Sequence, residues 1–197
     1  MAAVNFAFMK GMLPLMPILM KSLARLSLVA ALLILLSACT GIPKGIEPVR
    51  DLDAERYLGT WYSIVRLDHS FERRLTDVSA EYSLREDGRI RVVNRGYHPG
   101  KQEWREAEGV ASFIEDDSVG RLRVSFFGPF YGGYNIIGLD TENYEYAMVS
   151  GPTRGYFWIL ARQPALSEET LDRLIAQAKV LGFAVDDLIF VEHGLAP

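Results

Sequence analysis

Few side chains in this 197-residue chain have the types and spacing that catalysis or metal binding requires. Cys39 is the single cysteine, which excludes an intramolecular disulfide, and no CxxC or Cys/His cluster offers a zinc site. His69, His98 and His193 are isolated from one another, and no GxSxG sequence supplies the nucleophile of an esterase. We therefore predict that the chain is not an enzyme and holds no metal or cofactor.

The segment before Cys39 has the pattern of an export signal. Lys21 lies before an apolar run over 26–36, and two small residues follow that run. This order is typical of a secretory signal peptide, and an apolar core of about 11–13 residues is shorter than a transmembrane helix. We therefore assign residues 1–38 to a signal peptide, with Met20 as an alternative initiator.

The end of this signal, Leu36-Ser37-Ala38-Cys39, resembles the bacterial lipobox. The resemblance implies that diacylglycerol is attached to the Cys39 thiol, that the signal is cleaved before it, and that the new amino terminus is acylated, for example with palmitate. Thr40, in place of Asp, implies export to the outer membrane. Several acyl chains would anchor the protein firmly, with the folded domain in the periplasm.

Charge separates the leader from the rest of the chain. Residues 1–38 hold three basic and no acidic residues, and the remaining 18 basic and 25 acidic residues give a net charge of −7. This balance excludes the basic face that binds nucleic acid. Pro and Gly punctuate residues 40–50 without periodicity, so we predict that residues 39–56 form a lipidated N-terminus and an extended tether.

Short strand-like runs, bounded by turn residues, recur about every 10–13 residues after the tether. They cover 58–67, 76–85, 89–97, 104–114, 120–127, 133–140, 144–150 and 155–162. A helix capped by Ser167 and ended by Gly182 follows, and a short ninth strand is expected at 188–191. The expected fold is all-β: an eight-stranded antiparallel up-and-down β-barrel over 57–197, with one C-terminal α-helix packed outside.

Three motifs on these strands carry a resemblance to a known family. They are Gly59-Thr60-Trp61-Tyr62, Leu139-Asp140 with Tyr144, and Trp158-Ile159-Leu160-Ala161-Arg162. In this order they resemble the conserved regions of the lipocalins, and the run 124–135 resembles the bacterial outer-membrane members related to apolipoprotein D. The resemblance implies a non-enzymatic lipid carrier for envelope maintenance under stress. Some members dimerise, so it also allows a homodimer.

Barrel geometry gives the motif residues a structural role. In an eight-stranded meander the start of strand one and the end of strand eight meet at one end, which places Trp61 beside Arg162. A guanidinium stacked on an indole stabilises a fold by ~0.5–2 kcal/mol. We therefore expect Gly59, Trp61, Asp140 and Arg162 to close the floor of the barrel.

An eight-stranded barrel encloses one small ligand, and alternation along the strands predicts which residues line it. If Trp61 points inward, Ser63, Val65 and Leu67 do so too. The predicted ligand-binding residues are Tyr82, Asn94, Phe113, Phe126, Tyr134, Tyr146 and Trp158. Strands six and seven are apolar on both faces, so alternation leaves the direction of two of these tyrosines open. Small inward residues such as Gly109 favour a hollow interior.

The links at the open end carry basic and aromatic residues, among them Phe71, Arg73, Arg74 and Lys101, whereas the turns at the closed end are acidic. Such a rim suits anionic head groups, although Glu72 dilutes its charge. We therefore expect the ligand to be a fatty acid or lysophospholipid. Two alternatives remain: an envelope-structural lipoprotein with a filled barrel, and a carrier of another small hydrophobic ligand such as haem.

Overall fold

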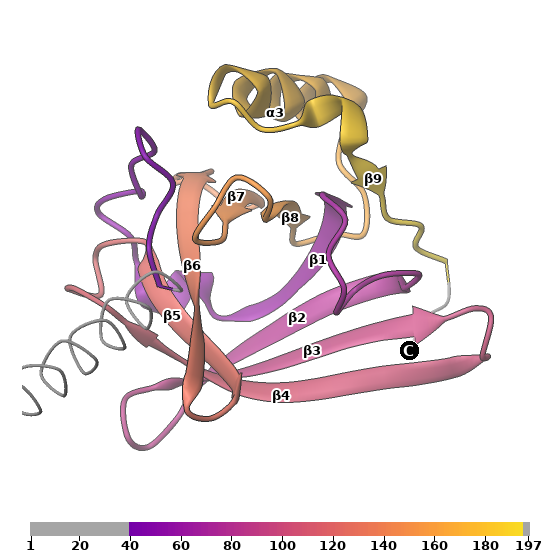
Figure 1. Cartoon of the computed structure of the whole chain (residues 1–197). Helices are drawn as coiled ribbons and strands as arrows, with labels where there is room; N and C mark the ends of the chain where they lie inside the picture. The colour runs from indigo at the N-terminus through magenta and orange to yellow at the C-terminus, as the bar shows by residue number, and fades with distance from the viewer. Residues whose placement is uncertain (1–39, 195–197) are drawn as a thin grey trace, which may run out of the picture. The chain divides into compact units, whose positions relative to one another are not determined.

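The computed structural model describes residues 40–194. The predicted signal peptide over 1–38 and the predicted lipidation site Cys39 lie outside the described residues. The described strands form one antiparallel sheet in the order β2-β3-β4-β5-β6-β7-β8-β1-β9, and β2 also pairs with β1. This additional pairing closes β1 to β8 into a ring, which confirms the predicted eight-stranded barrel (Figure 1).

The elements follow the predicted order along the chain. The strands are β1 (Gly59–Arg66), β2 (Thr76–Leu84), β3 (Ile90–His98), β4 (Glu103–Phe113), β5 (Arg121–Phe127), β6 (Phe130–Leu139), β7 (Tyr146–Ser150), β8 (Phe157–Ala161) and β9 (Ile189–Phe190). The helices are α2 (Ala54–Tyr57), α3 (Glu168–Val180) and the 3-10 turn η1 (Val185–Asp187). The sequence does not predict α2, because four residues are too few to show a helical period.

A β-bulge in β1 changes which residues face the barrel interior. Ser63 and Val65 pair with successive residues of β8, so one extra residue of β1 lies between them. Beyond the bulge the alternation is reversed. Val65 and Leu67 are buried on the outer side of the wall, under α3, and not in the interior as predicted. Arg66 is the residue that turns inward instead, because it pairs with inward-facing Trp158.

The C-terminal segment completes the barrel wall near the open end. β1 pairs with β2 only over its first half, residues 59–62, and beyond that point β9 occupies the edge of β1. The amide of Asp77 on β2 donates to the carbonyl of Glu192 at 2.8 Å, and the amide of Gly194 donates to the Asp77 carboxylate at 2.8 Å. The predicted ninth strand is therefore part of a longer segment inserted between β1 and β2.

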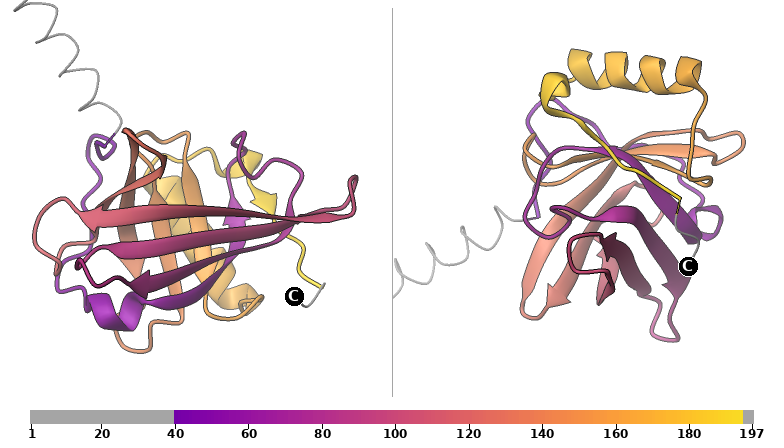
Figure 2. Two further views of the ribbon diagram at one scale, coloured as in Figure 1. Left: turned by 90° about the horizontal axis from the view of Figure 1, so that it is seen from below. Right: turned by 90° about the vertical axis from the view of Figure 1, so that its right-hand side faces the viewer.

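Helix α3 covers the outer face of the wall formed by β7, β8 and β1, as Figures 1 and 2 show. The Ser167 hydroxyl accepts from the amide of Thr170 at 3.2 Å, and Gly182, with a φ of +82°, ends the helix. Leu174 and Ala178 are buried against the sheet. Both predicted helix ends and the outside position of the helix are confirmed. No helix within residues 40–194 has the length and apolar character to cross a membrane.

Tyr146 belongs to this outer layer, contrary to its prediction as a ligand-binding residue. It packs in the cluster between sheet and helix, where the guanidinium of Arg173 lies 5.1 Å from the centroid of its ring. Its neighbour Ala147 is part of the interior cluster, so alternation along β7 turns Tyr146 outward. A strand that is apolar on both faces gives no sequence signal for this direction.

The segment that follows residue 40 lies against the barrel and does not form the predicted extended tether. The Asn135 side chain on β6 donates to the carbonyl of Gly41 at 3.1 Å, and Arg154 in the β7–β8 link donates to that of Lys44 at 2.9 Å. The amide of Val49 donates to a carbonyl of β6 at 2.8 Å. These hydrogen bonds, and the burial of Ile46 and Leu52, hold this segment to the wall.

Candidate ligand-binding site

The floor of the barrel is built from the motif residues of β1 and β8. The guanidinium of Arg162 lies 4.0 Å from the centroid of the Trp61 ring, so the predicted stacking is present. Arg162 also donates to the carbonyls of Thr60 at 3.0 Å and Tyr144 at 3.3 Å, and to that of Arg56. One side chain thus joins three segments at the closed end, which explains its role in closure.

Gly59 and Asp140 support the same floor through the backbone. Gly59 has a φ of +92°, and a Cβ at this position would lie 3.3 Å from Nη1 of Arg162, so a larger residue is strained and crowded here. The Asp140 carboxylate accepts from the amides of Glu142 and Asn143, each at 3.3 Å, and so shapes the β6–β7 turn. The four predicted closure residues therefore meet at one end of the barrel.

Three tyrosine hydroxyls form a polar group inside the largely apolar interior. The hydroxyls of Tyr57 and Tyr134 lie 2.7 Å apart, and the Tyr82 hydroxyl donates to that of Tyr134 at 3.0 Å. Burial raises the pKa of all three, that of Tyr82 to about 12, so the group is uncharged. Tyr57 is absent from the predicted site because it lies on α2, outside the predicted strands.

The predicted interior residues other than Tyr146 share one face of the sheet. Tyr82, Phe113, Phe126, Tyr134 and Trp158 belong to the cluster that contains Trp61. Asn94 pairs with Ala80, another member of that cluster, and therefore points the same way. Trp61 and Tyr82 are buried, whereas Ala80, Phe126 and Trp158, and Phe113 at the closed end, are partly exposed.

Gly109 does not enlarge the interior as predicted. A Cβ at this position would lie 2.8 Å from the Phe126 ring and 2.7 Å from the carbonyl oxygen of Ser125. The space that the missing side chain leaves is therefore filled by Phe126. A small residue identifies a hollow only where no neighbour occupies the space, and sequence does not show this.

Three side chains converge on the Glu72 carboxylate at the mouth of the barrel. Arg66, only 2% exposed, has its Nε 3.5 Å from Oε2 of Glu72 and donates through Nη2 to the Glu72 carbonyl at 2.9 Å. The indole N–H of Trp158 donates to the same Oε2 at 3.3 Å, and Nε2 of His69 lies 3.6 Å from it. We call Arg66, His69, Glu72 and Trp158 the mouth cluster.

Only Trp158 of the mouth cluster is among the sequence-predicted site residues. Arg66 is missed because the bulge reverses its direction. Glu72 is expected to be a solvated rim charge, but the β1–β2 link folds it inward, where it is 9% exposed. His69 is an isolated loop histidine in the sequence, yet its ring stacks on that of Phe71, with centroids 4.1 Å apart. No local pattern signals these long-range placements.

Burial controls the charge of this cluster. It raises the pKa of Glu72 to about 7, although the nearby Arg66 charge acts in the opposite direction. It lowers the pKa of His69 to about 4, and Arg66 adds to that effect. At neutral pH His69 is therefore uncharged and Glu72 is near the midpoint of its titration. Across residues 40–194 no three His, Cys, Asp or Glu side chains are grouped as a metal requires.

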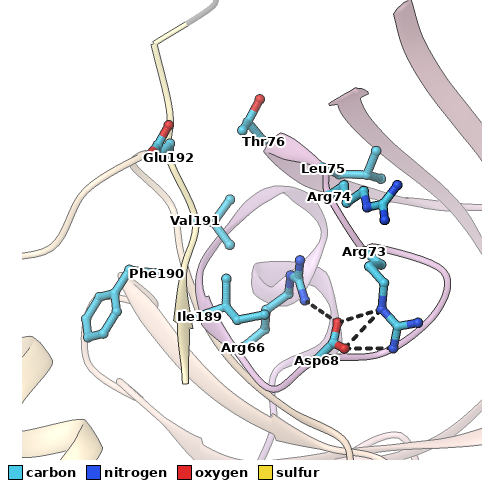
Figure 3. Close-up of a pocket in the computed structure, with 10 residues that line it drawn as sticks. All are labelled: Arg66, Asp68, Arg73, Arg74, Leu75, Thr76, Ile189, Phe190, Val191 and Glu192. Atoms are coloured by element: carbon cyan, nitrogen blue, oxygen red, sulfur yellow. Dashed lines mark hydrogen bonds and ion pairs between the residues drawn. The ribbon is translucent and has the colours of Figure 1, made fainter. Parts of the chain in front are cut away.

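A surface hollow of about 460 Å³ adjoins the mouth cluster between the β1–β2 link and β9 (Figure 3). It shares only Arg66 with the cluster. Within it Asp68 lies 2.7 Å from the Arg73 guanidinium and 3.9 Å from that of Arg66. Asp68 therefore pairs with Arg73 and lies near Arg66, while Arg74 lines the same hollow together with the apolar residues of β9.

A closed up-and-down barrel with a sealed floor, an apolar interior and a polar mouth defines a class of binding proteins for small apolar ligands. Residues 52–193 match the lipocalin-like domain family. The chain belongs to this family.

Similar proteins include named bacterial lipoproteins. The chain is 51% identical over 160 residues to the outer membrane lipoprotein Blc of Vibrio cholerae, covering 81% of this chain and 94% of the relative. It is 48% identical over 164 residues to the protein of the same name from Escherichia coli K12, covering 83% and 92%. The structure of insecticyanin from the tobacco hornworm matches with a TM-score of 0.63 at 20% identity, covering 79% of this chain and 88% of that chain, and supports the fold alone.

Proposed function

We propose that the chain is an outer-membrane lipoprotein whose barrel binds a fatty acid or lysophospholipid for envelope maintenance under stress. The observation that carries this proposal is the barrel interior, in which Arg162 and Trp61 close one end, apolar side chains form the wall and three tyrosine hydroxyls form a buried polar group. A narrow interior of this kind accommodates one apolar chain, and the mouth accommodates its polar head.

The anchor is the second part of the proposal. Cys39 is the only thiol in the chain and stands at the end of a lipobox-like sequence, and two relatives that align over most of the chain are named outer membrane lipoproteins. We infer that Cys39 carries diacylglycerol and that the mature protein begins there. Labelling with radioactive palmitate tests this: Cys39→Ala abolishes the label, and equal labelling of both proteins overturns the anchor.

The ligand is tested by binding measurements on delipidated protein. Trp158→Ala removes an interior indole at the mouth, whereas Trp104→Ala, the matched control, removes an exposed indole at the outer end of β4. We expect Trp158→Ala to raise the dissociation constant for lysophospholipid about tenfold, because a buried aromatic contact contributes about 1.4 kcal/mol. Trp104→Ala leaves it unchanged.

Native mass spectrometry of protein extracted from its own membrane identifies the natural ligand. A co-purified single-chain lipid is expected. A wild-type protein that carries no lipid and binds none after delipidation refutes lipid carriage and favours the alternative of a filled, structural barrel. The alternative of a filled barrel is supported by Phe126, whose ring occupies the space beside Gly109.

A further inference from the structure

We propose that the open end of the barrel contacts the membrane surface, and that its exposed aromatic side chains enter the interface of the membrane that carries the anchor. This inference rests on the acylated Cys39 of the proposed function. It adds the orientation of the barrel and the surface by which a lipid enters it.

The exposed apolar side chains within residues 40–194 are concentrated at the open end. In an up-and-down meander the β1–β2, β3–β4, β5–β6 and β7–β8 links all lie at that end. These links and the strand ends beside them carry the exposed residues Phe71, Trp104, Phe127, Phe130, Tyr131 and Tyr156. Of the other large exposed apolar side chains in this part of the chain, Leu84 and Ile114 lie at the closed end, and Val180 and Phe190 lie on α3 and β9. So uneven a distribution marks an interaction surface.

The β5–β6 hairpin is the most exposed part of this surface. Phe127 and Phe130 flank its tip and are 80% and 70% exposed. Behind them, the guanidinium of Arg123 lies 5.1 Å from the centroid of the Tyr131 ring. Phenyl rings at a tip, backed by a tyrosine and an arginine, match the polarity gradient of a membrane interface, in which aromatic rings lie at head-group depth and cations reach phosphate.

The start of the described chain lies beside the same hairpin. The Gly41 carbonyl accepts from Asn135 at 3.1 Å, and a Cβ at Gly133 would lie 2.7 Å from that carbonyl oxygen. Gly133 is three residues from Phe130, so the two are within about 10 Å along β6. Cys39 is two residues before Gly41 in the sequence, and this spacing limits how far the anchor can be from the hairpin.

The charges of the two ends agree with this orientation. At the open end neither Arg74 nor Lys101 makes an ion pair with any residue of the described segment 40–194. At the closed end the turns present Glu86, Asp116, Asp117 and Glu142 to solvent. An anionic lipid surface attracts the first end and repels the second. The open end therefore faces the bilayer, and a single-chain lipid passes from the membrane to the interior without crossing water.

A site-specific label tests the orientation. Because acylation consumes the only native thiol, a cysteine introduced by Phe130→Cys or by Leu84→Cys is the single free thiol of the lipidated protein. Leu84 is the matched control, because it is 62% exposed but lies at the closed end. Each variant carries an environment-sensitive fluorophore and is reconstituted in vesicles of phosphatidylethanolamine and phosphatidylglycerol that contain a lipid-borne quencher.

We expect quenching at Phe130 to exceed quenching at Leu84 severalfold. Equal quenching, or stronger quenching at Leu84, overturns the inference. A blue shift at Phe130 without quenching also overturns it, because the covering molecule is then a second copy of the chain. Protein that fails to sediment with the vesicles refutes the anchor itself, whereas protein that sediments but is not quenched at Phe130 refutes the orientation alone.

A second measurement reports on lipid entry. The double variant Phe127→Ser with Phe130→Ser replaces two exposed rings, so it retains the fold, and Leu84→Ser is again the control. Transfer of a fluorescent lysophospholipid from vesicles to the lipidated double variant is expected to slow severalfold, with unchanged affinity in detergent. Transfer rates equal to those of wild type and Leu84→Ser contradict a role of the hairpin in membrane contact.

Discussion

Replacing Glu72 by glutamine isolates the electrostatics of the mouth cluster. Glutamine keeps the shape of the side chain and still accepts the N–H of Trp158, which lies 3.3 Å from Oε2, but it cannot ionise. Burial raises the Glu72 pKa from 4.5 to about 7. At about 1.4 kcal/mol for each pH unit, ionising Glu72 in the folded protein costs about 3 kcal/mol more than in the unfolded chain.

The sign of the effect follows from the direction of the pKa shift. The folded-state pKa of Glu72 lies above the unfolded value, so its contribution to stability is fully present below about pH 4.5 and is lost as the pH rises through about 7. The variant Glu72→Gln does not undergo this loss. We therefore expect the two proteins to be equally stable near pH 4.5 and the variant to be more stable by up to about 3 kcal/mol at pH 8.

His69 acts in the opposite direction and is present in both proteins. Its folded-state pKa of about 4 lies below the unfolded value of 6.5, so its contribution is lost as the pH falls from 6.5 to 4. In wild type the two effects nearly cancel between about pH 4.5 and 6.5, and the stability curve is flat there. In Glu72→Gln the effect of His69 is unopposed, so the stability of the variant rises over this interval.

Urea unfolding followed by tryptophan fluorescence between pH 4 and 8 measures both curves. Glu142→Gln, at an exposed position in the β6–β7 turn, is the control and follows the wild-type curve. A wild type that is more stable than Glu72→Gln at pH 8 refutes the reasoning. That result means that the Arg66 charge, with its Nε 3.5 Å from the carboxylate, outweighs the cost of burial.

Three further substitutions test the frame of the barrel by urea unfolding. Gly59→Ala is expected to lower the free energy of unfolding by about 1–2 kcal/mol, because alanine is strained at the positive φ of this position. An unchanged urea midpoint contradicts this strain. Arg162→Met removes the cation over Trp61 and leaves carbonyls without a donor, so we expect the free energy of unfolding to fall by about 2–3 kcal/mol. Near-UV circular dichroism of the indole changes if the stacking exists. Leu174→Ala, at a residue of α3 that is 1% exposed against the sheet, is expected to lower the free energy of unfolding by about 2–5 kcal/mol without altering ligand affinity. A lost affinity would show that α3 shapes the interior.

The strand order, the helix ends and the closure of the floor are predictable from the amino-acid sequence. Regular alternation and turn residues mark each strand, and a meander has only one way to bring Trp61 beside Arg162. Ser167 and Gly182 are predictable because helix capping depends on the conformation of one or two residues. Alternation, turn residues and helix caps each involve residues close together in the chain, so a single sequence is enough to predict them.

The side of the wall that several residues face depends on contacts made in the folded barrel. One extra residue in β1 moves Val65 outward and Arg66 inward, and nothing in the residues themselves marks the bulge. On β7, Tyr146 lies under α3 because both faces of that strand are apolar and only the packed helix distinguishes them.

The tertiary structure also created the mouth cluster and positioned the chain start beside the β5–β6 hairpin. Arg66, Glu72 and Trp158 come from β1, a link and β8, and they meet only when the ring of strands closes. The perturbed pKa of Glu72 has the same origin, because burial is a property of the closed barrel and not of the residue. Local sequence thus specifies the helices and strands of this protein, whereas the charge states of its buried groups and the make-up of its exposed surface are set by contacts between residues distant in the chain.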